Sequence, residues 1–509
     1  MFLEDKTRAI VTKDERDNIQ SLSSSVATRG LTSSFIALKE LTGISHAKVN
    51  VSFSSGYWLA FLAILISSLL LSGSACEAQL NLSYSAGTLD AANQFMGGTE
   101  MRSLVPHAGK LFAGNGYWED QPGPEGFQNA QVLVLSQASG KWSVDTSFGP
   151  RALATSAMSE IKFTTDGYGN KVSPISILVA STWNTSGAVN VYNRNDRTNS
   201  WLKTQLDFIA PAGTGLAQVR SFGSHVDRVT GISYVFAGED PHGIFRGTYV
   251  PASGNVDWNL TTEFNISTIN PAPWAETGLT IRVMSFADCT DAKGQTNLYA
   301  TVGQQIYKRI DGRSPSWSLV YTNPISGIAS QSGLRGLTAI PNPAGAGQVM
   351  LVTVEGTSPR VIRFDPNTNT GVTDLNLSSF VGAAWGTNLT NAYMIAAYNN
   401  MTSVNGELLI GLESFLPPRS IIPTGYKIYN IDSSDRLDYN AWYIARSASG
   451  TYSVHEIVLP PYAKPMVSTR TIAVSPFSDG AIYFGGFDAN KAPAHNTAWI
   501  ARGPATLTN

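Results

Sequence analysis

Apolar and polar residues alternate along most of the chain, in short runs separated by turns rich in Gly, Asp, Asn and Ser. A tryptophan opens a new alternating run directly after such a turn at intervals of roughly fifty to sixty residues, at Trp142, Trp201, Trp258 and Trp317. Alternation with a period of two is typical of half-buried β-strands, and each turn predicts a β-hairpin. The pattern therefore predicts an all-β protein built from a repeated hairpin unit.

A repeat of this length with about four strands per unit is typical of a β-propeller, in which each unit forms one blade. Seven units can be delimited along the chain, and the last supplies only three strands, at 469–474, 481–484 and 498–502. The alternating run at 80–85 is unused, and pairing it into the last unit would close the ring and remove exposed edges. We predict a seven-bladed β-propeller over 79–509 that is closed by this N-terminal strand, with six or eight blades as the alternatives.

Two segments resemble known repeat families. The sequence Ile-Tyr-Phe-Gly-Gly-Phe-Asp at 482–488 resembles the second-strand phrase of kelch repeats. The segment 307–317, which ends in Asp-Gly-Arg-Ser-Pro-Ser-Trp, resembles the Asp-box turn of sialidase-like propellers. Each motif matches in only one or two units, so the resemblance implies the propeller fold and not sialidase activity. A long insertion in the sixth unit, at 414–439, is expected to be a functional or capping loop.

The N-terminal region differs from the rest of the chain. Residues 57–71 are almost wholly apolar and uncharged, and small residues follow as far as Ala78. The run is short for a membrane-spanning helix and suits a signal peptide, with cleavage after Ala75 or Ala78. The polar extension at 1–56 leaves two alternatives open, a translation start near Lys48 or an uncleaved signal-anchor. We expect a secreted or extracytoplasmic protein that contacts the membrane only through this segment, at 57–78, if it is uncleaved.

The composition of the chain limits the kinds of partner that it is expected to bind. The chain has 35 basic and 37 acidic residues, and charged residues make up only 14% of it, which disfavours a nucleic-acid binder with a basic face. Its two cysteines, Cys76 and Cys289, provide no disulfide framework, and Cys289 is expected to be an unreactive, unpaired residue. We expect a monomer whose partner is a glycan or another protein.

Charged residues recur at equivalent positions of the predicted blades. An arginine begins the inner strand in five units: Arg102, Arg220, Arg282, Arg335 and Arg470. Acids end the second strand: Glu119, Asp120, Glu239, Asp240, Glu355, Glu413 and Asp488. These groups could line a polar funnel whose arginines bind a ligand carboxylate or phosphate. They could equally form a structural ring in which each arginine pairs with an acid and ties blades together.

Other candidate residues lie in turns. Tyr117 and Trp118 precede Glu119 and Asp120, and aromatic faces beside carboxylates are suited to gripping sugars, although these rings could instead cap the blade. Four histidines are expected in loops at the blade faces: His107, His225, His242 and His495. His242 is the best general-base candidate because Glu239 and Asp240 lie beside it, and its structural alternative is a turn histidine bonded to backbone. No zinc-type spacing occurs, so neither a metal nor a cofactor is expected, and a metal site assembled from His, Asp and Glu of different blades is the alternative.

These features favour an exported propeller that binds a glycan or a protein partner on its loop-rich face. The alternative is a hydrolase or lyase that acts on an anionic carbohydrate in the arginine-lined funnel, with Glu119, Asp120, Glu239, Asp240 and His242 as the catalytic candidates. A third hypothesis is a purely structural interaction module. Two solvent-open carboxylates about 5 to 10 Å apart would favour the enzyme, and arginines saturated by ion pairs would favour the scaffold.

Overall fold

The computed structural model describes residues 80–117, 129–149, 151–209, 218–240, 242–266, 281–324, 333–385, 389, 393–415, 441–457, 459, 466, 468–487 and 496–504. The chain divides into two compact units, Met1–Ala75 and Cys76–Asn509, and every described residue belongs to the second. The predicted extension, the apolar run at 57–71 and most of the insertion at 414–439 therefore lie outside the described residues. Within the described ranges, no helix has the length and apolar character needed to cross a membrane.

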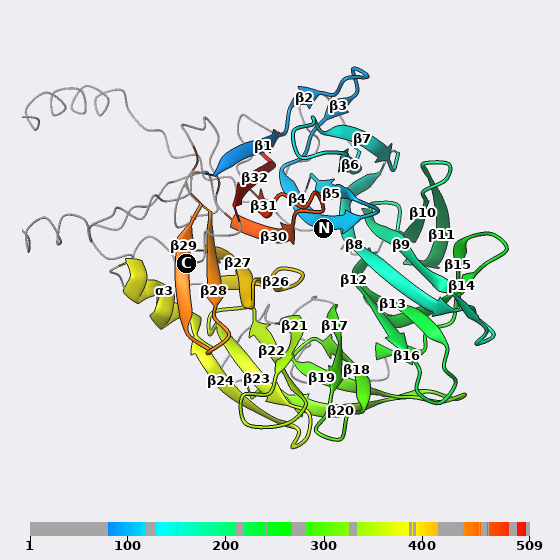
Figure 1. The fold of residues 1–509 in the computed structure, drawn as a ribbon, viewed down its shortest axis with the longest axis vertical. Coiled ribbons are helices and arrows are strands. Elements are labelled where there is room, and N and C mark those ends of the chain that lie inside the picture. Colours follow the sequence, from blue (N-terminus) through cyan, green and yellow to red (C-terminus); the bar gives the residue numbers. More distant parts are fainter. Residues whose placement is uncertain are drawn as a thin grey trace, which may run out of the picture. The chain divides into compact units, whose positions relative to one another are not determined.

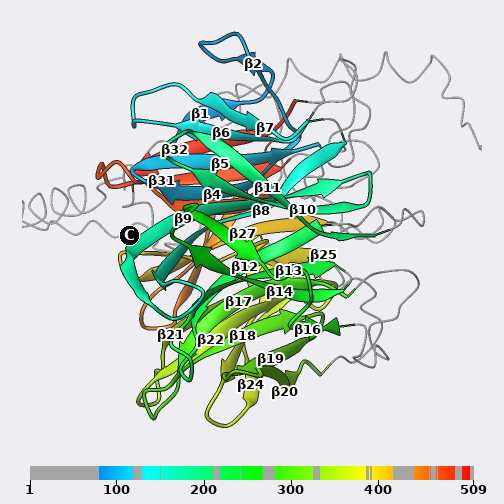
Figure 2. The same cartoon turned by 90° about the vertical axis from the view of Figure 1, so that its right-hand side faces the viewer.

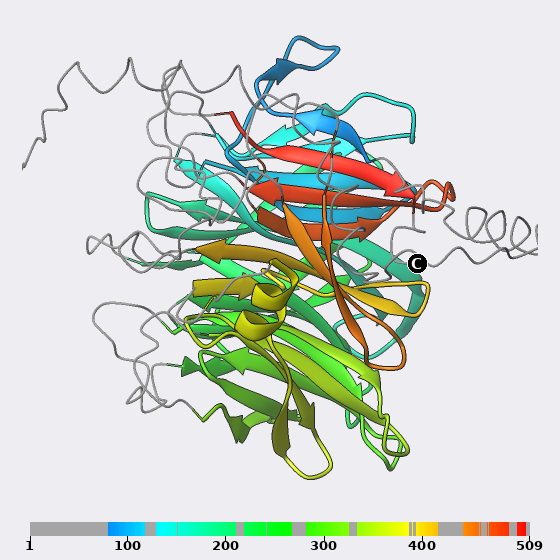
Figure 3. The same ribbon diagram turned by 90° about the vertical axis from the view of Figure 1, so that its left-hand side faces the viewer.

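The described part of the second unit is all-β apart from one short helix, and its strands form curled antiparallel sheets in chain order (Figures 1, 2 and 3). The first sheet contains β4 (Glu100–His107), β5 (Lys110–Gly116), β6 (Gln131–Leu135) and β7 (Ser143–Ser147). The next contains β8 (Ala152–Thr165), β9 (Lys171–Asn184), β10 (Ala188–Asn195) and β11 (Ser200–Phe208). It is followed by β12 (Gln218–Val226), β13 (Ser233–Asp240), β14 (Gly243–Val250), β15 (Asn255–Trp258) and β16 (Phe264–Asn265).

The remaining sheets follow the same plan. One contains β17 (Val283–Thr290), β18 (Thr296–Val302), β19 (Gln305–Ile310) and β20 (Ser316–Thr322). Another contains β21 (Leu334–Pro341), β22 (Gln348–Val354), β23 (Arg360–Asp365) and β24 (Thr370–Asn376). In the next, β25 (Tyr393–Ala396) and β26 (Thr402–Val404) both pair with β27 (Glu407–Phe415), and β28 (Trp442–Arg446) and β29 (Tyr452–Glu456) complete it.

The last sheet joins the two ends of the described region. It contains β30 (Ser468–Val474), β31 (Ala481–Phe487) and β32 (Trp499–Pro504), and β1 (Asn81–Ser85) adds to β32 as its outer strand. This pairing is the one that the unused alternating run at 80–85 predicts. A small hairpin of β2 (Thr88–Leu89) and β3 (Phe95–Met96) then leads into β4. In Figure 1 the first strands of successive sheets lie nearest to a common centre, and neighbouring first strands pack together.

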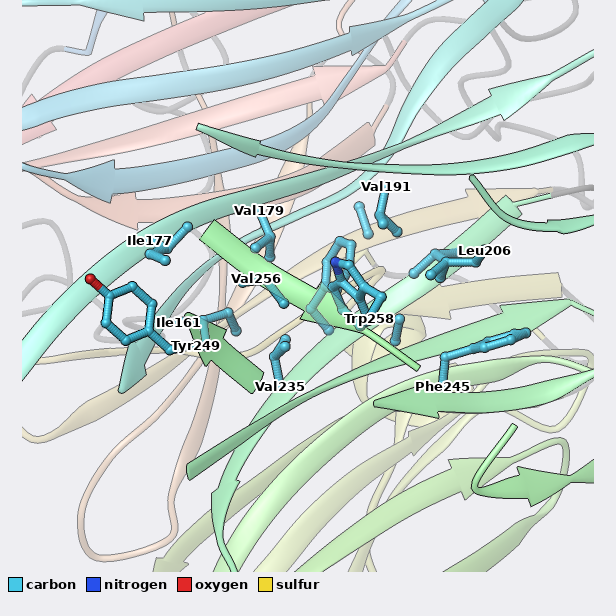
Figure 4. Packing of buried hydrophobic residues seen from close by; sticks show 14 of the residues in the cluster. Ile161, Ile177, Val179, Val191, Leu206, Val235, Phe245, Tyr249, Val256 and Trp258 are labelled. Carbon is cyan, nitrogen blue, oxygen red and sulfur yellow. The ribbon is translucent and has the colours of Figure 1, made fainter. Parts of the chain in front are cut away.

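Apolar side chains fill the space between neighbouring sheets. Figure 4 shows Val179 and Val191 from one sheet packed with Val235, Phe245 and Trp258 from the next. The three valines are fully buried, and burying such a side chain contributes about 1.5–3 kcal/mol. Strands that have a sheet on either side are buried on both faces, as β6 is at every position, and such strands read as near-continuous apolar runs.

The helix α3 (Leu377–Trp385) was not predicted from the sequence. It begins after Asn376, whose side-chain oxygen accepts a hydrogen bond from the Ser379 amide at 3.0 Å, as an N-cap residue does. Leu377 and Val381, one helical turn apart, are buried in the core shared with the β25–β29 sheet. The helix therefore covers an apolar flank of that sheet.

Three of the four recurring tryptophans bond a sheet to the one before it. The indole Nε1 of Trp201 donates to Asp145 of β7 at 2.7 Å, and that of Trp317 donates to Glu263 at 3.1 Å. Trp142 donates in the same way to Ser83 of β1, at 3.0 Å. These bonds link the outer strand of one sheet to the outer edge of the preceding sheet. The turn and tryptophan that mark the repeat thus have a structural role, because the indole links neighbouring sheets by a hydrogen bond.

Two histidines reinforce these junctions, and their predicted position in loops was wrong. His107 and His225 are buried at the ends of β4 and β12, because each inner strand extends further than the alternation indicated. The ring nitrogens of His225 bond to Asp288 at 2.7 Å and Asp311 at 3.1 Å in the next sheet. Burial alone would lower the pKa of His225, but the two carboxylates outweigh it and raise the pKa to about 9.

Candidate functional site

The predicted arginines gather where the first strands begin. In three sheets the arginine is the extra residue of a β-bulge, at Arg102, Arg220 and Arg470. Around Arg102, for example, Met101 pairs with Asn115, and Ser103 pairs with the preceding residue, Gly114. A bulge leaves its extra residue out of the ladder and re-aims the side chain. All three guanidinium groups are buried, which places their charges inside the protein.

Tyr398 contacts three of these arginines, Arg102, Arg335 and Arg470, and it was not among the site residues predicted from the sequence. Its hydroxyl accepts a hydrogen bond from Arg102 Nη2 at 2.7 Å, and its carbonyl accepts one from Arg335 Nη1 at 2.9 Å. The guanidinium carbons of Arg335 and Arg470 lie 4.7 and 4.2 Å from its ring centroid. Burial would raise the pKa of Tyr398, but the charges of Arg102 and Arg470 outweigh it and lower the pKa.

Buried acids pair with the arginines around Tyr398. Glu413 Oε2 lies 3.0 Å from Arg470 Nε, and Glu100 bridges Arg470 and Arg102, from whose Nη1 it lies 3.6 Å. Arg335 pairs with Glu355 at the end of β22. These contacts fit the structural-ring hypothesis for Arg102, Arg335 and Arg470, because their charges are already matched inside the fold.

Arg220 and Asp240 form the same kind of pair in the β12–β16 sheet. Arg220 Nε donates to Asp240 Oδ2 at 2.6 Å, and the carboxylate is completely buried. Burial raises the pKa of Asp240, and the charges of Arg220 and Arg282 oppose that effect. The pair holds the beginning of β12 against the end of β13.

Arg282 is the exception among the five. It lies one residue before β17 and two before Met284, the extra residue of the bulge in that sheet, so it is displaced from the register of Arg220. Its side chain is half-buried, and within the described part of the chain its guanidinium forms no ion pair or hydrogen bond. The charge of Arg220, followed by burial, lowers its pKa. The charges of Glu355 and Asp240 oppose that effect without forming an ion pair with Arg282 among the described residues.

A second group of candidate residues converges beside this pair. Ligand atoms of Asp207, Glu239 and His242 all lie within 4.8 Å of one another. His242 Nδ1 lies 2.5 Å from Asp207 Oδ2, and its backbone amide donates to Glu239 Oε2 at 2.8 Å. Burial, together with the nearby charges of Asp240 and Asp207, raises the pKa of Glu239 to about 8. The structure therefore joins two of the predicted catalytic candidates, and Asp207 had no sequence signal.

The other candidates are placed as follows. Tyr117 is buried, so its ring faces the interior and not the solvent. Trp118, Glu119 and Asp120 lie outside the described residues. Cys289 is buried and unpaired, and burial raises the pKa of its thiol to about 12, which leaves it unreactive.

A pocket of about 360 Å³ opens farther along the first strands, between β4, β30 and the segment that leads into β26. Arg470, Asn399 and Met158 contribute to its wall. The Asn399 side chain donates to the backbone carbonyl of Arg102 at 2.5 Å, which anchors the Tyr398 turn against β4. The Tyr398 cluster therefore adjoins this pocket, and Arg470 belongs to both.

No family model matches the chain, and no curated protein matches it. Among solved structures, it is similar to a GH74 enzyme from Niastella koreensis, with 13% identity and a TM-score of 0.42, over 82% of this chain and 55% of that one. It thus spans just over half of that enzyme. It is also similar to the lectin BP39L from Burkholderia pseudomallei, with 12% identity and a TM-score of 0.44, over 80% of this chain and 97% of the lectin.

A fungal alcohol oxidase of the AA5 family, solved in complex with copper, is similar as well. Its identity is 10% and its TM-score 0.43, over 84% of this chain and 76% of that one. Because all of these similarities are distant, the function of this chain has to be inferred from its own residues.

Proposed function

We propose that the chain is an exported, seven-bladed β-propeller that binds an acidic glycan at Arg282, beside the Arg220–Asp240 pair. The architecture is supported by the order of the sheets and by the addition of β1 to β32. Export is supported by the apolar run at 57–71 and the small residues after it.

The guanidinium of Arg282, which forms no ion pair or hydrogen bond with any described residue, carries the binding proposal. Arg102, Arg335 and Arg470 have buried acidic partners, and Arg220 has Asp240. Arg282 forms no ion pair among the described residues, and it experiences repulsion from the charge of Arg220 together with attraction from the charges of Glu355 and Asp240. A bound carboxylate would relieve this repulsion and accept the fork of hydrogen bonds that a guanidinium offers.

An unused acceptor near the arginines favours a sugar acid over a simple anion. Gln218 lies two residues before Arg220 on β12, and its side-chain oxygen is buried without a hydrogen-bond partner in the described part of the chain. A sugar hydroxyl would satisfy this oxygen while the ligand carboxylate meets Arg282. A glycan that contains a uronic or sialic acid has both groups.

The hydrolase or lyase alternative has weaker support. It calls for two carboxylates that face each other across an open site, about 5 to 10 Å apart. Glu239 and Asp240 are both completely buried, and Asp240 is held by Arg220. Binding without turnover therefore fits the described residues better.

The test is binding of the full chain to an array of acidic and neutral glycans, followed by titration calorimetry with the best ligand. We expect saturable binding to carboxylate-bearing glycans, a loss of at least about tenfold in Arg282→Gln, and partial retention in Arg282→Lys. Arg313→Gln is the matched control, because Arg313 is exposed in the turn between β19 and β20 of the same sheet. Equal affinity of Arg282→Gln and the wild type would refute the site, and release of a cleaved sugar would favour the enzyme.

A further inference from the structure

The cluster of Asp207, Glu239 and His242 has the composition and geometry of a metal site. Asp207 lies near the end of β11, Glu239 near the end of β13, and His242 directly before β14. One ligand atom from each lies within 4.8 Å of the other two. Because these residues come together through the packing of two sheets, no short sequence motif predicts the cluster.

The buried carboxylate of Glu239 is the second observation that points to a cation. The residue has no exposed surface, and its Oε1 has no hydrogen-bond partner in the described ranges. A buried carboxylate oxygen without a partner is costly. The neighbouring Asp207 carboxylate is not matched by an arginine or lysine among the described ion pairs; it accepts a hydrogen bond from the Phe208 amide, and its ion-pair partner is His242. A cation between these groups would satisfy Glu239 Oε1.

The cluster is also accessible. The side chains of His242 and Asp207 retain 44% and 26% of their exposure, so an ion can enter from solvent and keep water among its ligands. Glu239 closes the inner side. A half-open tripod of this kind leaves coordination positions for water or for a ligand oxygen.

We propose that Asp207, Glu239 and His242 bind one divalent transition-metal ion of the Mn²⁺, Fe²⁺ or Zn²⁺ class. An imidazole with two carboxylates suits these ions, whereas Ca²⁺ and Mg²⁺ prefer oxygen ligands alone. The ion takes the place of the proton shared by His242 Nδ1 and Asp207 Oδ2 and of any proton on the Glu239 carboxyl, and these protons are released to solvent. The proposal goes beyond glycan binding and does not depend on Arg282.

The experiment uses the full chain after treatment with a chelator, titrated separately with Zn²⁺, Mn²⁺ and Ca²⁺ by calorimetry. We expect one equivalent of Zn²⁺ or Mn²⁺ to bind and to raise the melting temperature, and Ca²⁺ to bind much more weakly. His242→Ala and Glu239→Gln should lower the affinity by at least about 100-fold. His455→Ala is the matched control, because His455 is a half-buried histidine in another sheet with Ser453 as a partner.

Two further measurements keep the result unambiguous. If Glu239→Gln does not fold, Asp207→Asn and His242→Ala decide the question, because both change partly exposed side chains. Arg282→Gln should keep full metal affinity, so a failure of the glycan site would not resemble a failure of this one. Absence of saturable Zn²⁺ and Mn²⁺ binding by the wild type would overturn the proposal. Equal affinities of His242→Ala and the wild type would overturn it too.

Discussion

Arg220 Nε donates a 2.6 Å hydrogen bond to Asp240 Oδ2, and both groups are buried beside a second arginine, Arg282, that has no ionic partner among the described residues. The Arg220–Asp240 pair is a structural element, and Arg282 is the candidate binding group. Removing either member of a buried pair leaves the other without its charge partner.

Arg220→Ala should therefore lower the free energy of unfolding by about 3–5 kcal/mol, as measured by urea denaturation. The comparison is Asp479→Ala, which breaks the partly exposed pair of Arg502 and Asp479 and should cost about 0–1 kcal/mol. Similar losses in the two variants would show that Asp240 is compensated in another way, with Arg282 as the nearest source of charge.

The stability of the protein should fall as the pH rises from about 6.5 to about 9, in part because of His225. Asp288 and Asp311 raise the pKa of folded His225 to about 9, whereas the unfolded histidine titrates near 6.5. The stabilisation is thus complete below pH 6.5 and is lost as the pH rises through 9. Its upper bound is about 3 kcal/mol.

The measurement is urea unfolding between pH 6 and 9.5 for the wild type, His225→Gln and His455→Gln. Glu239, with a pKa of about 8 in the fold, also makes the stability fall with rising pH, so the comparison of variants is essential. His225→Gln should reduce the fall in the free energy of unfolding with rising pH by the part that His225 contributes. His455→Gln should keep the wild-type slope, because burial lowers the pKa of that histidine. A His225→Gln profile parallel to the wild type would contradict the assignment.

The strand order was predictable because alternation and turn residues are local signals. The run at 80–85 was assigned to the last sheet because that sheet lacked one strand, and β1 does pair with β32. The helix α3 was missed because its nine residues carry neither an acid in the first turn nor a base in the last, and the N-cap Asn376 alone marks its beginning.

The site was only partly predictable, because its contacts join distant segments. The recurrence of arginines at the start of the first strands was visible in the sequence, but whether each had a partner was not. Tyr398 reaches its place through a left-handed backbone at Ala397, with φ of 52°, which no residue pattern announces. Asp207 joins His242 only through the packing of neighbouring sheets.

The tryptophans of the repeat differ in their hydrogen bonds, so the contribution of these bonds between sheets to stability can be tested. Trp317 donates to the carboxylate of Glu263, Trp142 to the hydroxyl of Ser83, and the buried Nε1 of Trp258 has no acceptor among the described residues. A hydrogen bond to a charged group contributes about 1.5–3 kcal/mol and one between neutral groups about 0.5–1.5 kcal/mol.

Trp317→Phe should therefore destabilise the protein more than Trp142→Phe does, once the contribution of the lost ring volume is subtracted from both. Trp258→Phe provides that volume term, because it removes an indole that makes no such bond. Thermal and urea unfolding of the three variants would give the order directly. If Trp258→Phe cost as much as Trp317→Phe, the tryptophans would act through packing alone, and the Asp145 and Glu263 carboxylates would be left to their arginine partners, Arg194 and Arg309.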